Sequence, residues 1–324
     1  MKVLISDYVW PSIEIEKEFF KKNFFDLEVS ESQDDLMSKI HDADALLFCF
    51  ADINESVLRR AKKLKVAQRY GIGVDNINLD VATELGIAVS NIPDYCIDEV
   101  SDHAMSMILA LNRTLTPHSN MVKNGKWKEV AKSDRFYRLR DATLGIIGFG
   151  RIGRRLSKKA QGFGLNVIAY DPYIKDSQID GVKMCSLDEL LSSSQMVSLH
   201  VPLNDETYHI IGKDQFELMP DDVILVNVSR GGLIDENILT DYLAQGKIKG
   251  VGLDVMEEEY PDANNPLFQF QNVIVTPHTA YFSQESNEEL QIRACEQVFK
   301  VISGKKPDYL INPEVLKHND VNLE

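Results

Sequence analysis

Short apolar segments alternate with amphipathic segments along most of the chain. In the first part, apolar runs predict strands at residues 2–7, 45–50, 65–70 and 88–92. Helical spacing of apolar residues predicts helices at 12–23 and 54–64, with Asn54 as the N-cap of the second. Short apolar strands that alternate with helices indicate a parallel sheet with helices on both faces.

A second alternating series begins at Thr143 and predicts six strands, at 144–148, 166–170, 196–201, 223–228, 250–255 and 273–276. Between the two series, residues 98 to about 115 have helical spacing, whereas residues 120–140 are polar and favour an arm or connector. A long helix is predicted at 286–302, ended by Ser303 and Gly304, and we expect the tail after it to pack on the first domain. The pattern predicts an α/β protein with two doubly wound parallel-sheet domains.

Composition narrows the range of partners. Of the 324 residues, 44% are hydrophobic and 26% are charged, which is typical of soluble proteins. No apolar run approaches the roughly 20 residues of a membrane span. The formal net charge of −15 repels nucleic acids. It repels small anions as well, so an anionic substrate needs cations placed locally.

The chain ends and the cysteines favour a cytoplasmic protein. The apolar run at residues 2–5 is too short for a signal peptide. The four cysteines are far apart and form no Cys-x-x-Cys pattern, so we expect neither structural disulfides nor a metal site.

The most specific local motif is a glycine-rich turn at residues 148–153. It has the form G-x-G-x-x-G, follows the strand predicted at 144–148 and opens a helical run at 154–162. In such turns one glycine makes the bend, one admits a pyrophosphate and one lets helix and strand pack closely. The residues expected to bind the cofactor here are Gly148, Gly150, Arg151, Ile152 and Gly153. The alternative is a glycine turn that binds no nucleotide.

Asp171 supports the nucleotide interpretation. It lies at the end of the next predicted strand, where a carboxylate accepts hydrogen bonds from the adenosine ribose hydroxyls. The same carboxylate repels a 2′-phosphate. The sequence therefore predicts NAD rather than NADP as the cofactor.

Three polar residues, Arg230, Glu259 and His278, follow the ends of three predicted strands in the second series. In an open parallel sheet, ligands bind outside the carboxyl ends of the strands. Arginine can hold the carboxylate of a 2-keto acid and polarise its carbonyl. Histidine donates a proton to the alkoxide near neutral pH, and a neighbouring carboxylate orients it. Taken singly, they could be an ion-pair partner, part of a solvated acidic run and a loop histidine. Together they favour a catalytic site.

With these motifs the chain resembles the D-isomer-specific 2-hydroxyacid dehydrogenase family over nearly its full length. The motifs are 71–76, 148–153, 200–203, 227–232, 254–259 and 276–278. The resemblance implies a catalytic triad of Arg230, Glu259 and His278. It implies cofactor contacts from His200, Val201, Pro202, Val228 and Asp254, and substrate contacts from Ile72, Gly73, Tyr95 and Tyr281.

The resemblance also implies an architecture. A flavodoxin-like substrate domain would comprise residues 1–98 and 285–324, with an NAD-binding Rossmann domain, residues 99–284, inserted in it. The helix after residue 98 and the arm at 120–140 resemble the family's dimer elements, so we expect a homodimer.

Within the family, residues 91–96 and 276–283 look most like the branch of C-terminal-binding proteins. Two positions depart from the pattern: Tyr281 replaces a usual tryptophan, and Tyr260 precedes Pro261 where proline often follows directly. The favoured function is NAD-dependent interconversion of a small 2-keto acid and its D-2-hydroxy acid.

Two alternatives stay open. One is a phosphoglycerate dehydrogenase, for which Arg69 is a possible phosphate ligand, although residues 46–53 hold no base and we expect no C-terminal regulatory domain. The other is an NAD(H)-sensing binding protein.

Overall fold

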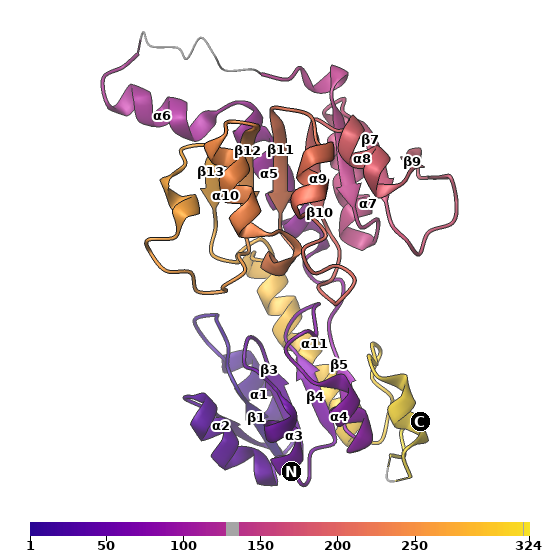
Figure 1. Ribbon diagram of the computed structural model, residues 1–324. Helices are drawn as coiled ribbons and strands as arrows, with labels where there is room; N and C mark the ends of the chain where they lie inside the picture. Colours follow the sequence, from indigo (N-terminus) through magenta and orange to yellow (C-terminus); the bar gives the residue numbers. More distant parts are fainter. Residues whose placement is uncertain (128–135, 320) are drawn as a thin grey trace. The chain divides into compact units, whose positions relative to one another are not determined.

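The computed structural model describes residues 1–127, 136–319 and 321–324 and consists of two compact units (Figure 1). Unit 1 comprises Met1–Tyr95 and Ser283–Glu324, and unit 2 is Cys96–Phe282. The chain leaves unit 1 once and returns to it once, so unit 2 is inserted in unit 1. The sequence predicted that the chain passes between the two units after residues 98 and 284. In the structure it does so after residues 95 and 282.

Unit 1 contains a parallel sheet in the order β2-β1-β3-β4-β5. Its strands are β1 (Lys2–Ile5), β2 (Asp26–Val29), β3 (Ala45–Phe48), β4 (Val66–Arg69) and β5 (Ala88–Ser90). The order 2-1-3-4-5 is that of flavodoxin-like sheets, as expected for this part of the chain. The strand β2 was not predicted, because none of its residues is fully buried and its apolar pattern is weak.

Helices cover both faces of this sheet. They are α1 (Glu14–Lys22), α2 (Gln33–Lys39), α3 (Glu55–Arg60), α4 (Leu79–Glu84) and α11 (Gln284–Ile302), with the 3-10 turns η1 (Ile40–Asp42) and η5 (Pro313–Lys317). The helices α1 and α11 pack on each other, and α11 packs on β3 and β4. On the other face, residues of α2, α3 and α4 form a core with Leu46, Phe48 and Val89. Asn54 caps α3 as predicted, since its side chain accepts from the backbone N–H groups of Ser56 and Val57.

The C-terminal tail packs on unit 1, which confirms the prediction for it. The side chain of Asn312 accepts a hydrogen bond from the Val89 amide at 2.8 Å and donates one to the Ile87 carbonyl at 2.9 Å. Its neighbour Ile311 donates its amide to the Val89 carbonyl at 2.8 Å. The last segment of the chain therefore completes the β5 edge of the sheet.

Unit 2 contains a larger sheet in the order β13-β12-β11-β10-β6-β7-β9-β8. The strands are β6 (Thr143–Ile147), β7 (Asn166–Tyr170), β8 (Gln178–Ile179), β9 (Val182–Met184), β10 (Met196–Leu199), β11 (Val223–Asn227), β12 (Ile248–Leu253) and β13 (Val273–Val275). All are parallel except β8, which pairs antiparallel with β9. From β9 to β12 this is the Rossmann order 3-2-1-4-5-6, with β13 added beyond it. The short strands β8 and β9 were not predicted.

The helices of unit 2 are α5 (Ile97–Asn112), α6 (Leu115–Lys123), α7 (Arg151–Gly162), α8 (Leu187–Ser193), α9 (Lys213–Leu218) and α10 (Glu236–Ala244), with 3-10 turns η2 (Leu139–Asp141), η3 (Gly231–Leu233) and η4 (Pro266–Gln269). One face of the sheet is covered by α5 and α7, which also pack on each other. On the other face, α8, α9 and α10 enclose a core that includes Leu190, Phe216 and Leu239.

The predicted arm needs a correction. The helix expected to reach about residue 115 ends at Asn112, and a second helix, α6, follows where part of an irregular arm was expected. Thr114 separates the two helices with a left-handed backbone (φ 51°). No residue of α6 is buried, so the sequence offers no apolar period to reveal it. Residues 128–135 of the predicted arm lie outside the described residues.

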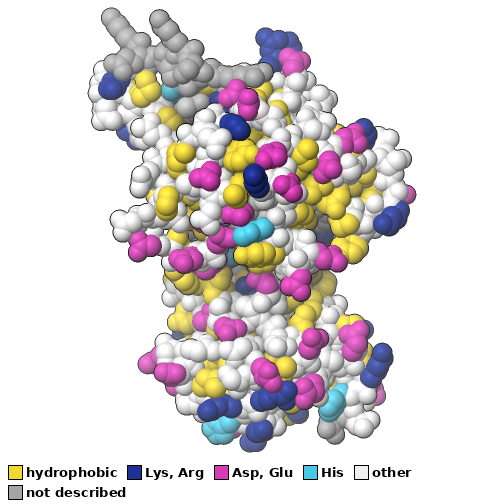
Figure 2. Space-filling view, viewed as in Figure 1, with side chains coloured by type: hydrophobic (Ala, Val, Ile, Leu, Met, Phe, Trp, Pro, Cys, Tyr) yellow, Lys and Arg dark blue, Asp and Glu magenta, His cyan; other side chains and the backbone are white. Residues whose placement is uncertain are grey.

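Within the described residues, no helix is long and apolar enough to cross a membrane. Acidic side chains are spread over the face of the molecule seen in Figure 2, with basic side chains between them. This distribution agrees with the net charge of −15.

Candidate active site

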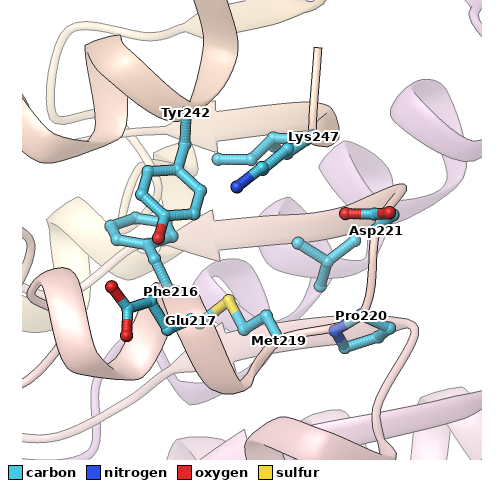
Figure 3. A pocket seen from close by; sticks show the side chains of 9 residues that line it. Phe216, Glu217, Met219, Pro220, Asp221, Tyr242 and Lys247 are labelled. Carbon is cyan, nitrogen blue, oxygen red and sulfur yellow. The ribbon is translucent and has the colours of Figure 1, made fainter. Parts of the chain in front are cut away.

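The predicted site residues of unit 2 lie at the carboxyl edge of its sheet. A separate pocket of about 130 Å³ opens at the opposite edge, beside Val223 and Ile248, which are the first residues of β11 and β12 (Figure 3). It is lined mainly by residues of α9, of α10 and of the loops that lead into these two strands. Since ligands of open parallel sheets bind at the carboxyl edge, the candidate active site is not this pocket.

The glycine turn links β6 to α7. Gly148 has a left-handed backbone (φ +93°), and a Cβ atom there would lie 2.5 Å from the His200 carbonyl oxygen. A Cβ atom on Gly153 would lie 2.2 Å from the carbonyl oxygen of Gly148. A Cβ atom on Gly150, in contrast, would meet no described residue within 4 Å. The first and third glycines thus permit close packing, while the second borders open space.

The open space beside Gly150 lies at the N-terminus of α7. Gly150 is the N-cap, and in the part of the chain that the structure describes no side chain caps this helix. The first N–H groups of a helix are therefore available to an anion, and the helix dipole favours negative charge there. Arg151 is the first residue of the helix and is exposed, and Ile152 follows it. The turn is suited to a pyrophosphate.

Asp171 directly follows β7 and holds the glycine turn. One carboxylate oxygen accepts from the Phe149 amide at 3.0 Å, and the other accepts from the Tyr173 amide at 3.0 Å. The position of Asp171 directly after this strand is the one predicted from the sequence, and the structure adds its contact with the glycine turn.

His200 follows β10 and is held in the neutral state. Its Nε2 lies 2.8 Å from the Ser198 hydroxyl, whereas its Nδ1 is buried and has no hydrogen-bond partner among the described residues. Burial lowers the pKa of His200 from 6.5 to about 3, although part of the residue reaches the surface. Val201 contributes a methyl group to the wall beside Gly148, and the Pro202 carbonyl accepts from the Thr207 hydroxyl at 2.7 Å.

Arg230 lies in the turn after β11. The Asn227 side chain donates to the Arg230 carbonyl at 2.7 Å, and Arg230 Nη1 donates to the Ser229 carbonyl at 2.8 Å. The next residue, Gly231, packs on the backbone of Met256, where a Cβ atom would lie 1.9 Å from the carbonyl carbon. The segment that carries Arg230 is thus pressed against the segment that leads to Glu259. Val228, at the start of this turn, is 8% exposed.

Glu259 and His278 are in direct contact. His278 Nδ1 lies 2.5 Å from Glu259 Oε1. The His278 backbone is left-handed (φ 51°), and its amide donates to the Asp254 carbonyl at 2.8 Å. The Tyr281 ring is edge-on to the imidazole, with ring centroids 6.3 Å apart. The structure therefore brings together four of the predicted site residues from the ends of β12 and β13: Asp254, Glu259, His278 and Tyr281.

Asp254 accepts several hydrogen bonds close to the His278–Glu259 pair. It is only 1% exposed. Its carboxylate accepts from the Thr276 hydroxyl at 2.5 Å and from the amides of Thr279 and Ala280 at 2.9 and 2.8 Å. These bonds fix the segment on which His278 lies.

Two further histidines near the site were not singled out from the sequence. His103 on α5 contacts Thr276, with 2.9 Å between Nε2 and the hydroxyl oxygen. The sequence could have revealed His103, because it is a polar residue within the apolar stripe formed by Val100, Ala104 and Met107. His209 contacts the carboxylate of Glu257, and its amide donates to the Gly232 carbonyl at 2.8 Å. It has no such signal, because it lies in a loop.

The remaining predicted residues belong to unit 1. Ile72 is half-buried, and its carbonyl accepts from the Asn91 side chain at 2.7 Å. The Gly73 carbonyl accepts from Arg69 Nε at 3.1 Å, and Tyr95, the last residue before unit 2, is 8% exposed.

Arg69 is unusual for a buried cation. It is 6% exposed and lies over the rings of Phe48 and Phe50, with 5.9 and 5.7 Å to their centroids. Within the described residues its hydrogen bonds go to the carbonyls of Tyr70 and Gly73, and no carboxylate forms an ion pair with it. A buried guanidinium without a counter-ion attracts an anion.

The fold and the glycine turn define a two-domain α/β protein with a dinucleotide-binding domain. Residues 105–280 match the family model described as "D-isomer specific 2-hydroxyacid dehydrogenase, NAD binding domain". The chain belongs to this family.

Relatives and solved structures agree with the assignment. The chain is 38% identical to a glyoxylate reductase of Thermococcus litoralis over 289 residues, which are 87% of each protein. It is 40% identical to a D-3-phosphoglycerate dehydrogenase of Methanocaldococcus jannaschii over 87% of this chain, but it spans only 54% of that relative's length. It resembles a crystal structure of D-lactate dehydrogenase from Aquifex aeolicus complexed with NAD and lactic acid, with a TM-score of 0.86, 30% identity and 97% of each chain covered.

Proposed function

We propose that this protein is an NAD-dependent oxidoreductase that interconverts a small 2-keto acid and its D-2-hydroxy acid. The observation that carries the proposal is the contact of 2.5 Å between His278 Nδ1 and Glu259 Oε1, at the same sheet edge as the dinucleotide-binding turn. A histidine oriented by a carboxylate is suited to move a proton to or from a substrate oxygen.

The residues present fit NAD. The open space beside Gly150 and the uncapped N-terminus of α7 suit the pyrophosphate. The Asp171 carboxylate suits ribose hydroxyls and repels a 2′-phosphate. When bound, NADH supplies the hydride that reduces C2 of the keto acid. The other residues that we propose to line the cofactor are Arg151, Ile152, His200, Val201, Pro202, Val228 and Asp254.

Arg230 would hold the substrate. Its planar guanidinium can bind the carboxylate with two hydrogen bonds and polarise the adjacent carbonyl. The family resemblance implies substrate contacts from Ile72, Gly73, Tyr95 and Tyr281 as well. In a protein with a net charge of −15, Arg230 supplies the local positive charge that an anionic substrate needs.

His278 would supply the proton. Since Nδ1 faces Glu259, the proton that reaches the substrate alkoxide leaves from Nε2. Glu259 holds the ring in this orientation and stabilises the imidazolium before the transfer. In the direction of oxidation, Nε2 accepts the hydroxyl proton instead.

NADH oxidation with a panel of 2-keto acids, followed by absorbance, tests this function. We expect turnover with at least one small member of the panel, such as glyoxylate, pyruvate or hydroxypyruvate. Arg230→Ala should lower kcat/KM about 10²- to 10³-fold and leave NADH binding largely intact, whereas Lys at this position should rescue poorly. Arg155→Ala, which removes an exposed arginine paired with Asp98, is the control. No turnover with any member of the panel contradicts the proposal and favours the dinucleotide-sensing alternative.

Oxidation of 3-phosphoglycerate is the second candidate. It is favoured by Arg69, a buried cation without a carboxylate partner in the described part of the chain. The same arginine also suits the carboxylate of an unphosphorylated substrate. NAD reduction with 3-phosphoglycerate and with D-lactate distinguishes the two, because only a phosphate site gives a preference for the first.

We also propose a homodimer built on unit 2. The helix α6 buries none of its residues, and Leu115 and Val122 on it are 55% and 44% exposed. Trp127, just beyond it, is 77% exposed. Apolar side chains grouped in this way are typical of a surface that pairs with another chain.

We further propose that the protein works in the cytoplasm. The four cysteines form no Cys-x-x-Cys pattern, and three of them are buried. This agrees with a reducing compartment. A reporter fused to the chain and localised in cells tests the proposal.

A further inference from the structure

His103 is a polar residue on the buried face of α5. This helix buries Val100, Ala104 and Met107 and packs on β11, β12 and α7. The His103 side chain is 24% exposed, and its Nε2 lies 2.9 Å from the Thr276 hydroxyl oxygen. A partly buried ring nitrogen is costly unless it is hydrogen-bonded, and here its partner lies two residues before His278.

The direction of the hydrogen bonds follows from the chemistry of the three groups. Thr276 Oγ1 lies 2.5 Å from Asp254 Oδ1. The Asp254 carboxylate also accepts two backbone amides, so it acts as an acceptor throughout. A hydroxyl carries one proton, which Thr276 therefore donates to Asp254. Its oxygen is left to accept, and His103 Nε2 must be the donor.

This chain of hydrogen bonds ends at the catalytic segment. The carbonyl of Asp254 accepts from the His278 amide at 2.8 Å, and its carboxylate binds the amides of Thr279 and Ala280. His278 has a left-handed backbone (φ 51°). Such a conformation is costly for residues other than glycine and persists only where surrounding contacts fix it. The contacts that fix it here run through Asp254 and Thr276 to α5.

We propose that His103 is a positioning residue of the active site. Its Nε2–H orients the Thr276 hydroxyl toward Asp254, and Asp254 then holds residues 276–280 so that His278 faces Glu259. His103 does not touch the reacting atoms. The inference rests on the proposed function for its catalytic consequence, but the fixing of residues 276–280 is independent of any substrate.

The test compares His103→Leu, which removes the donor, with His103→Gln, whose side-chain amide can replace Nε2–H. Hydrogen–deuterium exchange of the protein without substrate reports on residues 276–280. Steady-state reduction of the best keto acid with NADH and with its deuterated form reports on the chemical step. Met105→Leu, a substitution of similar volume at a buried position of the same helix, is the control.

We expect His103→Leu to increase exchange at Thr279 and Ala280, to lower kcat on the order of 10-fold and to raise the deuterium isotope effect, with a smaller change in KM. His103→Gln should restore all three readouts to within about threefold of the wild type, because its side-chain amide also carries N–H donors. Met105→Leu should change none of them.

The double variant His103→Leu/Thr276→Val decides whether the two residues act as one unit. If they do, the double variant loses no more activity than the worse single variant. The proposal is overturned if the losses of the two single variants multiply in the double variant. It is also overturned if exchange at 276–280 is unchanged in His103→Leu, or if His103→Gln does not restore function. If His103→Leu does not fold, Thr276→Val tests the same link without altering α5. If the wild type reduces no keto acid, the proposed function fails, while the exchange measurement still decides the role of His103.

Discussion

Gly153 in the first turn of α7 packs directly on the carbonyl oxygen of Gly148, at a distance that leaves no room for a side chain. A Cβ atom would lie 2.2 Å from that oxygen. We predict that Gly153→Ala forces α7 away from β6, destabilises unit 2 by about 1–3 kcal/mol and weakens NADH binding about 10-fold or more. Urea unfolding and NADH fluorescence titration measure the two effects.

Gly162→Ala is the matched control for this substitution. Gly162 is the last residue of the same helix, and a Cβ atom there would meet nothing within 4 Å. It should bind NADH as the wild type does. If both alanine variants weaken NADH binding equally, the close approach of Gly153 to Gly148 is not the cause.

Asp171 should determine the choice of dinucleotide. Its carboxylate lies beside the glycine turn, where it accepts from the amides of Phe149 and Tyr173. We predict that Asp171→Asn raises the ratio of kcat/KM for NADPH over NADH by about 10-fold, because a like charge facing the 2′-phosphate is removed. Asp176→Asn alters an exposed carboxylate of the same loop and should leave the ratio unchanged. An NADPH preference in the wild type would contradict the assignment.

Substitutions of His278 and Glu259 should affect proton transfer more than substrate binding. His278→Gln removes the proton donor, so kcat should fall about 10²- to 10⁴-fold with a smaller change in KM. Glu259→Gln keeps an acceptor for Nδ1 but removes the charge that stabilises the imidazolium, so the loss in kcat should be nearer 10-fold. Glu258→Gln, at the exposed neighbouring position, is the control. A wild-type kcat in Glu259→Gln would exclude this role for the carboxylate.

His200 should make the protein less stable in acid. Burial holds its pKa at about 3 in the folded protein, against 6.5 ordinarily. Between these values the unfolded chain binds a proton that the folded chain does not, so the free energy of unfolding falls as the pH drops below 6.5. From pH 6.5 to 5 this contribution is about 1.6 kcal/mol.

We predict that the free energy of unfolding of His200→Gln falls by about 1.6 kcal/mol less than that of the wild type between pH 6.5 and 5. Urea unfolding at the two pH values measures the difference. His41→Gln, at an exposed position, should behave as the wild type does. Equal losses in all three proteins would show that His200 is protonated without cost.

The exposed apolar residues of α6 should be needed for dimer formation. We predict that Leu115→Glu/Val122→Glu gives a monomer at micromolar concentration in light scattering, because two charges would be buried in the interface. Phe163→Glu, which also replaces an exposed apolar residue of unit 2, should remain dimeric. A monomeric wild type would refute the proposed dimer.

The sequence predicted those features that have a local or periodic signature. The strand β7 has the bounds expected from its apolar run, and Asn54 caps α3 through a local side-chain bond. The glycine turn was predictable because each position has its own steric requirement. The family resemblance implied the pairing of His278 with Glu259, and the positions of both residues after strand ends were compatible with it.

Other features depend on contacts that are distant in the chain and leave no local pattern. The helix α6 buries no residue, and the short strands β8 and β9 offer little apolar period. The bond from His103 to Thr276 joins residues 173 positions apart, so neither residue reveals its partner. The lowered pKa of His200 results from burial, and the burial of this residue cannot be read from the sequence.

The insertion of unit 2 has a consequence for synthesis on the ribosome. Residues 1–95 emerge first, but α11, which covers β4 and places Phe299 against Phe19 and Phe25, emerges only after all of unit 2. At the usual rate of translation this delay is on the order of ten seconds or more. During that interval unit 2 can fold to completion, while β4 lacks its covering helix and exposes apolar surface. The nascent first segment is therefore the part of this protein that we expect chaperones to bind.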